Sequence, residues 1–282
     1  MHYGLTVYIN DPRAIAELTR EAESAGWDGF FIPDALGIET KDFPAAPWYD
    51  PEVTLAAMVM RTERIRIGTF ISAVTRRRPW KLARQIGTLD QLSNGRIILA
   101  VGLGAAESDG GFYKVGEAMD LKTRAALLDE TLAIMSGLWT GQPFSFSGEH
   151  YKVQEMTMLP PPVQKPRVPI WVVGVWPKPK SMQRALRWDG IIPQKYGAAP
   201  DQATADPAEY AAIKQYIDEH RDESGPFEIV TGGSTPANSR KKAIEKVDSY
   251  ARAGATWWIE NIWSPDPEKA SARIKKGPPR SG

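Results

Sequence analysis

Short runs of β-branched and aromatic residues alternate along the chain with longer stretches whose apolar residues recur at helical spacing. The first run, Tyr3–Ile9, predicts a strand, and the stretch from Asp11 to Ser24 predicts a helix with Asp11 as N-cap and Pro12 at its first position. The further strands expected are 29–33, 64–74, 96–101, 170–173, 189–192, 227–231 and 257–262. The further helices expected are 51–61, 79–93, 122–139, 181–188, 207–222, 236–252 and 267–276.

Eight strands, each followed by a helix, are the count of an α/β fold of the (β/α)8 TIM-barrel type. An open doubly wound sheet would also alternate, but eight evenly placed units favour closure. No linker or shift in composition divides the chain, so we expect one domain over residues 1–282. The proline-rich stretch 143–169, with three consecutive prolines from Pro160, predicts a long irregular excursion on the surface.

Composition removes several classes of function. Lys and Arg number 35 against 34 Asp and Glu, so the net charge of +1 indicates neither a nucleic acid nor an anionic membrane as partner. The chain has no cysteine, and its three histidines lie far apart, so no metal site is expected. It contains neither GxSxG nor GxxxxGK[ST]. No secretory signal and no apolar run of about 18–20 residues is visible, so we expect a soluble, cytoplasmic protein.

In a closed barrel, function lies at the C-terminal ends of the strands. Gly102-Leu103-Gly104 follows the fourth strand, where glycines either let the backbone approach a ligand or merely turn the chain. Gly174-Val175-Trp176 and Lys178 follow the fifth strand and precede a helix start that suits a phosphate. The alternative there is a solvated lysine beside a capping serine.

Two acids end strands and are candidates for acid–base catalysis: Asp34 after the second strand and Glu260 in the eighth. A register error of one residue would turn either side chain away from the barrel mouth. The run Arg76–Arg78 could hold an anion, although such a run is more often a solvated loop. Few acid–base groups and many aromatic residues suit an organic redox cofactor, or ordinary packing. These aromatic candidates are Trp48, Tyr49, Trp176, Trp257, Trp258 and Trp263.

Several motifs, in this order, resemble the bacterial luciferase-like monooxygenase family and together span nearly the whole chain. They are Arg61–Thr69, Arg78–Ala83, Thr88–Arg96, Ala100–Gly104, Gly137–Trp139, Pro169–Val172, Trp188–Gly190 and Ala253–Thr256. The resemblance implies a TIM barrel, usually dimeric, that holds FMN or the deazaflavin coenzyme F420 in its mouth.

The resemblance also implies where the cofactor lies. A non-prolyl cis peptide at the end of the third strand supports the back of the ring in that family, and the matching bond here is Phe70–Ile71. We therefore expect Phe70, Ile71 and Ser72 to bind the cofactor. The phosphate-contacting loops of the family correspond to the two glycine-containing segments after the fourth and fifth strands.

Two departures bear on the reaction. Many members carry a histidine after the acidic residue of the second strand, where this chain has Ala35, and some F420 members use a glutamate where it has Ala105. The missing groups favour an FMN-dependent oxidoreductase with monooxygenase-type chemistry on a small organic substrate. F420-dependent hydride transfer, a flavin-binding barrel without turnover, and a non-redox enzyme acting on phosphorylated sugars are the alternatives. We expect a homodimer.

Overall fold

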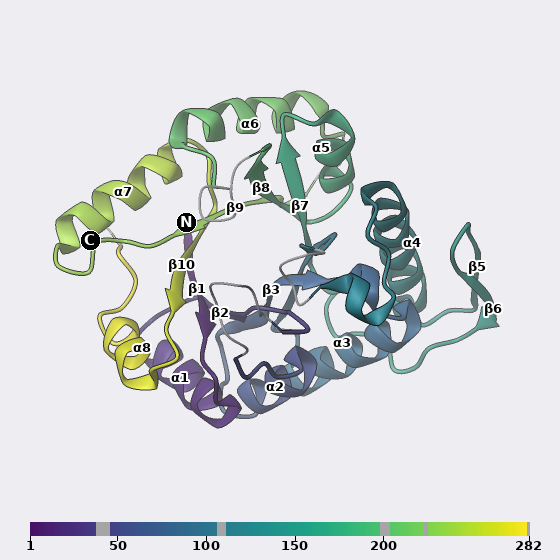
Figure 1. Ribbon diagram of the computed structural model, residues 1–282, viewed down its shortest axis with the longest axis horizontal. Coiled ribbons are helices and arrows are strands. Elements are labelled where there is room, and N and C mark those ends of the chain that lie inside the picture. The colour runs from purple at the N-terminus through teal and green to yellow at the C-terminus, as the bar shows by residue number, and fades with distance from the viewer. Residues whose placement is uncertain (38–45, 106–110, 198–203, 223–224, 281–282) are drawn as a thin grey trace.

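A closed parallel barrel, surrounded by helices, is the architecture of this protein (Figure 1). The computed structural model describes residues 1–37, 46–105, 111–197, 204–222 and 225–280. Around the barrel the strands follow the order β1-β10-β9-β8-β7-β4-β3-β2. The expected (β/α)8 TIM barrel is therefore confirmed.

The elements keep the order that the hydrophobic pattern predicts, with ends that differ by a few residues. The barrel strands are β1 (His2–Tyr8), β2 (Gly29–Ile32), β3 (Arg66–Ala73), β4 (Ile97–Gly102), β7 (Ile170–Trp176), β8 (Gly190–Lys195), β9 (Glu228–Gly233) and β10 (Trp257–Trp263). The α-helices are α1 (Pro12–Ser24), α2 (Pro51–Val59), α3 (Pro79–Ser93), α4 (Leu121–Trp139), α5 (Pro179–Leu186), α6 (Pro207–His220), α7 (Arg240–Arg252) and α8 (Pro267–Ile274). Two 3-10 turns are η1 (Val74–Arg76) and η2 (Phe112–Val115).

Local capping fixes several helix ends where the sequence places them. The Asp11 side chain accepts the N–H of Arg13 at 2.8 Å, and the following proline occupies the first turn of α1. Asp50 accepts the N–H of Val53 at 2.9 Å at the start of α2. Helix α3 ends at Asn94, whose φ of 53° is left-handed, so the chain turns directly into β4.

Alternation along the strands divides their side chains between two layers. Inward-facing residues, such as Phe31, Trp171 and Trp257, fill the barrel, and the intervening residues pack against the helices. Both faces of each strand are buried, which is why the strands read as nearly continuous apolar runs.

The excursion 143–169 is not wholly irregular, so that part of the prediction is wrong. It contains an antiparallel hairpin, β5 (Phe144–Ser147) and β6 (Lys152–Met156), which lies beyond α4 (Figure 1). A Cβ on Gly137 of α4 would come within 2.0 Å of the Phe144 ring, so only glycine lets the hairpin dock this closely. The Glu130 carboxylate accepts the N–H groups of residues 149–151 and holds the turn.

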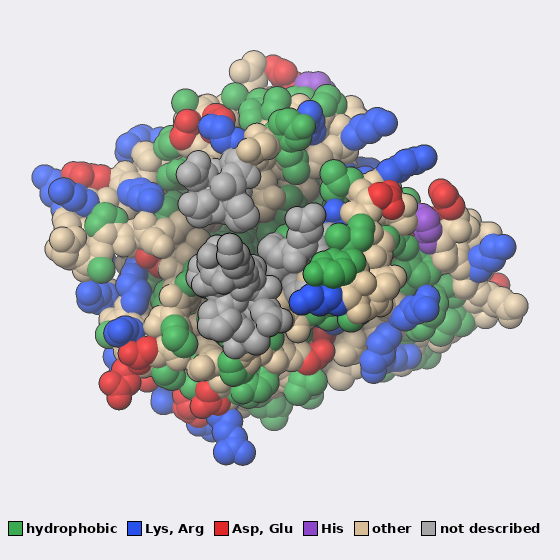
Figure 2. Space-filling view, in the orientation of Figure 1, with side chains coloured by type: hydrophobic (Ala, Val, Ile, Leu, Met, Phe, Trp, Pro, Cys, Tyr) green, Lys and Arg blue, Asp and Glu red, His purple; other side chains and the backbone are tan. Residues whose placement is uncertain are grey.

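The molecular surface carries both signs of charge. Lys, Arg, Asp and Glu side chains are spread around the margin of the face shown in Figure 2, as the net charge of +1 leads one to expect. Among the residues that the structure describes, no helix combines the length and the apolar character needed to cross a membrane.

Candidate active site at the C-terminal end of the barrel

A cavity of about 400 Å³ opens at the C-terminal end of the strands. Its walls come from the ends of β2, β3, β4, β7, β8 and β10, from the segments that follow them, and from α4 and α5. The lining residues are Pro33, Asp34, Ala35, Trp48, Phe70, Ile71, Ser72, Ala73, Gly102, Leu103, Gly104, Ala105, Leu121, Leu128, Val173, Val175, Ser181, Arg184, Gln194 and Trp263.

A bulge at the end of β3 forms one wall of this cavity. The peptide bond between Phe70 and Ile71 is cis, as the resemblance implies. The pairing between β3 and β4 shifts here: Thr69 lies opposite Leu99 and Ser72 opposite Val101. The extra residue presents both Phe70 and Ile71 to the cavity, where they are partly buried against the barrel core.

The Asp34 carboxylate fastens the end of this bulge. Its Oδ2 accepts the hydroxyl of Ser72 at 3.1 Å and the N–H of Ala73 at 3.0 Å. Its Oδ1 is bound by Arg77 at 2.9 Å and by the adjacent Arg76. Two members of the predicted Arg76–Arg78 run therefore hold a buried carboxylate instead of facing a ligand.

This surrounding fixes the charge of Asp34. Burial opposes its ionisation, but Arg77 and Arg76 outweigh that effect and hold the pKa of Asp34 below its ordinary value. The side chain is wholly inaccessible and its oxygens already accept four donors. Asp34 thus lies at the cavity, as expected, but because it is ionised at neutral pH it has no proton to give there.

Glu52 at the start of α2 lies behind Asp34. Its Oε2 accepts Nη1 of Arg77 at 2.9 Å, so one guanidinium bridges two carboxylates. Burial raises the pKa of Glu52 to about 7, with Arg77 opposing the rise. Glu52 is therefore the member of this group that changes its protonation near neutral pH.

The segment after β4 lies where the sequence places it. Gly102, Leu103 and Gly104 all line the cavity, and a Cβ on Gly102 would lie 3.2 Å from Val173 and 3.3 Å from Ile71, which also line it. Gly104 has φ +77°, a conformation that favours glycine. Arg124 of α4 donates to its carbonyl at 2.6 Å and fixes the loop.

The segment after β7 is divided by strand alternation. Val175 lines the cavity, whereas Gly174 faces outward: a Cβ there would meet Ile191 at 2.4 Å. Trp176 packs against Tyr216 of α6 with ring centroids 5.7 Å apart. The Lys178 ammonium lies 3.6 Å from the Tyr196 ring centroid. The structure therefore does not bring Gly174, Trp176 or Lys178 to the cavity.

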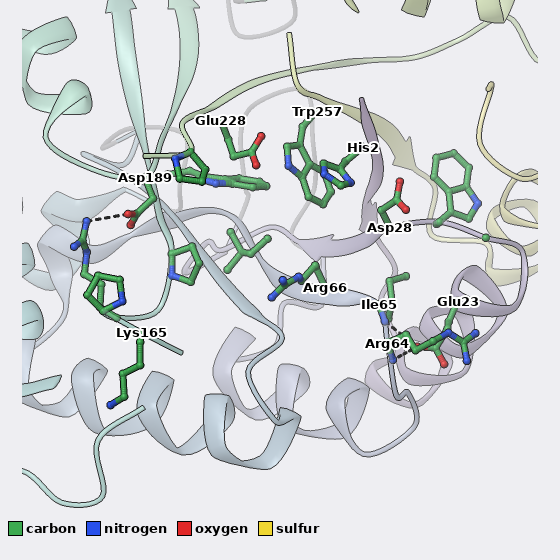
Figure 3. A pocket seen from close by; sticks show the side chains of 18 of the residues that line it. His2, Glu23, Asp28, Arg64, Ile65, Arg66, Lys165, Asp189, Glu228 and Trp257 are labelled. Carbon is green, nitrogen blue, oxygen red and sulfur yellow. Dashed lines mark hydrogen bonds and ion pairs between the residues drawn. The ribbon is translucent and has the colours of Figure 1, made fainter. Parts of the chain in front are cut away.

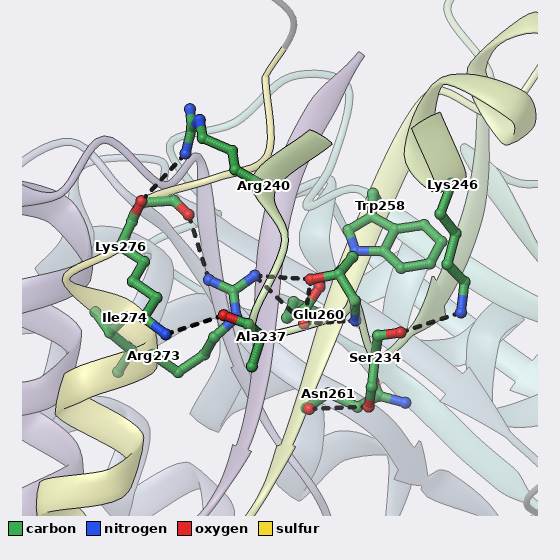
Figure 4. Close-up of polar contacts among 12 residues, drawn as sticks. Ser234, Ala237, Arg240, Lys246, Trp258, Glu260, Asn261, Arg273, Ile274 and Lys276 are labelled. Atoms are coloured by element: carbon green, nitrogen blue, oxygen red, sulfur yellow. Dashed lines mark hydrogen bonds and ion pairs between the residues drawn. The ribbon is translucent and has the colours of Figure 1, made fainter. Parts of the chain in front are cut away.

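Glu260 also lies away from the cavity. It alternates outward with Trp258, whose Nε1 donates to Oε2 at 2.9 Å (Figure 4). Oε1 accepts both the N–H and the hydroxyl of Thr235 and lies 3.3 Å from Arg273 of α8. With 3% of its side chain exposed, Glu260 ties β10 to the outer layer and contacts no lining residue through these bonds.

Aromatic side chains close the edge beside β1 and β10. Trp48 and Trp263, both candidates from the sequence, line the cavity. Tyr8 lies between them, with its ring centroid 4.7 Å from that of Trp48 and 5.8 Å from that of Trp263. The indole Nε1 of Trp48 is buried and bonds to no described residue. A ligand acceptor at this edge would satisfy that N–H.

Helices α4 and α5 supply lining residues that the sequence analysis does not predict. Leu121 and Leu128 of α4 add apolar surface, and Arg184 of α5 is the cation among the described lining residues. Arg184 binds Asp129 through Nε at 2.8 Å and Nη2 at 3.0 Å, which leaves Nη1 without a described partner. The rule that functional residues follow the C-terminal ends of strands does not select these residues, because they lie within helices.

The described lining thus combines a flat apolar slot with few polar groups. Its hydrogen-bonding side chains are Ser72, Ser181, Gln194, Trp48 and Arg184, in addition to Asp34, which already binds two arginines. The lining suits a planar ring with a polar edge, because apolar walls cover the faces and isolated donors fix the orientation.

Known proteins resemble this chain in sequence and in fold. A curated F420-dependent glucose-6-phosphate dehydrogenase from Intrasporangium calvum is 33% identical over 168 residues, which are 59% of this chain and 49% of that enzyme. The chain spans about half the length of the curated relatives that carry this name.

Solved structures show the same fold. The coenzyme F420-dependent tetrahydromethanopterin reductase from Methanopyrus kandleri superposes with a TM-score of 0.76 at 17% identity, covering 98% of each chain. The monooxygenase RslO1 from Streptomyces bottropensis gives a TM-score of 0.78 at 16% identity, covering 98% of this chain and 97% of that one. The family model described as luciferase-like monooxygenase matches residues 2–276, and the chain therefore belongs to that family.

Proposed function

We propose that the protein is an oxidoreductase that holds a flavin-type tricyclic cofactor in the C-terminal cavity. The observation that carries this proposal is the bulge at Phe70–Ile71, which faces an apolar slot kept open by the missing side chain of Gly102. A planar ring fits there because its faces meet apolar groups on both sides.

The residues of this chain have separate tasks in such a site. Phe70 and Ile71 back the ring, and Asp34 keeps their bulge in place through Ser72 and the Ala73 N–H. The bound cofactor supplies the hydride or electron transfer. Trp48 and Trp263 cover the edge and exclude water.

The polar end of the cofactor belongs near α5. The Nη1 of Arg184 bonds to no described residue, and the neighbouring Ser181 hydroxyl already accepts the N–H of Val175 at 2.9 Å. A guanidinium beside a hydroxyl suits a phosphate group. This assignment replaces Lys178, which the sequence suggested for that task.

Different observations support F420 and FMN as the cofactor. The relatives named F420-dependent glucose-6-phosphate dehydrogenases share 32–33% identity with the aligned part of this chain, and they favour F420. We therefore propose F420 as the first candidate, in place of the FMN expected from the sequence.

One observation keeps FMN as the second candidate. Oxidation of an alcohol by hydride transfer releases a proton that a base must accept. Among the described lining residues, Asp34 is the carboxylate, and it is already bound to two arginines. A monooxygenase reaction does not require a base for a substrate hydroxyl.

A titration decides between these cofactors. Protein free of cofactor is titrated with F420 and with FMN, each followed by fluorescence, and then tested for reduction or reoxidation. Gly102→Val, which fills the slot, should weaken binding at least tenfold, whereas Gly87→Ala in α3, outside the cavity, should not. Failure to bind either cofactor would overturn the proposal, and binding without turnover would favour a non-catalytic flavin-binding barrel.

The homodimer, the small-molecule substrate and the cytoplasmic location stay predictions. Exposed apolar residues on one side support self-association: Val53 is 70% and Met60 69% exposed at the two ends of α2. Light scattering on purified protein measures the mass, and a monomer at micromolar concentration would contradict the dimer.

A further inference from the structure

A second cavity, of about 630 Å³, lies at the N-terminal end of the barrel (Figure 3). It is lined from the starts of β1, β3, β4, β7, β9 and β10, from the segments that precede the strands, and from the end of α1. No described residue lines both cavities, because the inward-facing core of the barrel separates them. The family assignment gives this cavity no task.

Its inner wall is aromatic. The indole rings of Trp171 and Trp257 meet edge to face, with centroids 5.1 Å apart, and the His2 ring lies 4.9 Å from Trp257 (Figure 3). Three prolines border this surface at positions 166, 169 and 226. Trp171 and Trp257 are buried, so the exposed His2 ring, which lies over Trp257, is the part of this wall that a flat molecule reaches. The Nε1 of Trp257 is buried and bonds to no described residue.

The charged residues of the cavity fall into paired and unpaired groups. Arg280 binds Asp28 at 2.7 Å, and Arg167 binds Asp189 at 3.0 Å. Glu23 uses its carboxylate to accept the N–H groups of residues 63–65. The carboxylates of Asp28, Asp189 and Glu23 therefore already have partners within the protein.

Two lining cations, Arg66 and Lys165, form no ion pair with a carboxylate of the described residues, whereas Arg64 interacts electrostatically with Glu23. Arg66 donates to neutral acceptors, the Gly95 carbonyl at 2.9 Å and Gln164 at 3.2 Å. Lys165 lies in the lower left of Figure 3, Arg66 near the centre, and Glu228 above them. An anion near Arg66 and Lys165 is attracted by two positive charges that no described carboxylate neutralises through an ion pair.

We propose that this cavity binds a flat aromatic carboxylate, with its ring against the His2 ring that lies over Trp257 and its carboxylate toward Arg66 and Lys165. The N-terminal face of a TIM barrel ordinarily serves stability. Cations that pair with no described carboxylate, beside a concave aromatic wall, suit an anion that brings its own apolar body.

Calorimetric titration with 2-naphthoate, and with the neutral 2-naphthalenemethanol, tests the proposal. The carboxylate should bind at least tenfold more tightly than the alcohol, since charge-assisted bonds form only with the former. Arg66→Gln and Lys165→Gln should each weaken naphthoate binding about tenfold. The matched control is Arg61→Gln, because Arg61 pairs with Glu17 and lines neither cavity.

Gly102→Val reports on the other cavity and should leave naphthoate binding unchanged, even if that variant no longer takes a flavin. Arg66 and Lys165 are both exposed, so each can be replaced alone and both can be replaced together. If one single variant fails to fold, the other still tests the proposal. Equal affinity for the two naphthalenes, unaltered binding by the double variant, or loss of binding in Gly102→Val would overturn the proposal.

Discussion

Replacing Asp34 with asparagine tests whether this residue positions the β3 bulge or takes part in the chemistry. The substitution keeps the shape and removes one buried negative charge. Arg76, which is 7% exposed and has no other described carboxylate, would then be left uncompensated, whereas Arg77 keeps Glu52. Breaking a buried ion pair in this way costs about 3–5 kcal/mol. Because an amide still accepts one donor, we expect a loss of about 3 kcal/mol in the free energy of unfolding.

The pH dependence of this loss follows from the lowered pKa of Asp34. A carboxyl whose pKa is lower in the folded state contributes stability at neutral pH, and that contribution disappears as the pH falls through the folded-state pKa. The difference between the native protein and Asp34→Asn should therefore be largest at pH 7 and shrink below about pH 4.

Equilibrium urea unfolding at several pH values measures the loss of stability, and cofactor titration measures the site. A positioning role predicts that stability and cofactor affinity fall together, because the single amide oxygen cannot accept both from the arginines and from the two donors of the bulge. If Asp34→Asn unfolds at the same urea concentration as the native protein but loses turnover, Asp34 takes part in the reaction and the reasoning is refuted.

Three further predictions concern other parts of the molecule. Glu52→Gln should stabilise the protein by up to about 3 kcal/mol at pH 8 and have little effect at pH 4.5. The reason is that a folded-state pKa raised from 4.5 to about 7 makes the native protein lose stability as the pH rises from 4.5 to 7. A pH-independent difference in urea unfolding would contradict this. Arg184→Gln should weaken cofactor binding about tenfold in a fluorescence titration, whereas Arg187→Gln, which contacts the same Asp129 outside the cavity, should not; equal effects would remove Arg184 from the site. Glu130→Ala should cost about 1–3 kcal/mol and speed hydrogen exchange at residues 149–151 without changing cofactor affinity, and unchanged exchange there would show that the turn holds itself.

The sequence alone determines the number and order of the barrel strands and of the α-helices that follow them, since these depend on local pattern. The helix starts at Asp11 and Asp50 and the helix end at Asn94 are local devices, and the Asp11 cap forms as expected. The cis peptide at Phe70–Ile71 came from the family resemblance, and the structure has it. The hairpin after α4 was missed because its four- and five-residue strands depend on packing against Gly137 and on Glu130.

Only the tertiary structure decided which side chains reach the cavity. Neighbouring residues on a strand point to opposite layers, so Val175 faces the cavity and Gly174 faces α5 although they are adjacent. Glu260 points outward for the same reason, and Arg184 reaches the cavity from a helix that the strand pattern does not select. The hydrophobic pattern gives no signal for this choice, because both faces of a buried parallel strand are apolar and its inward direction is set only when the barrel closes.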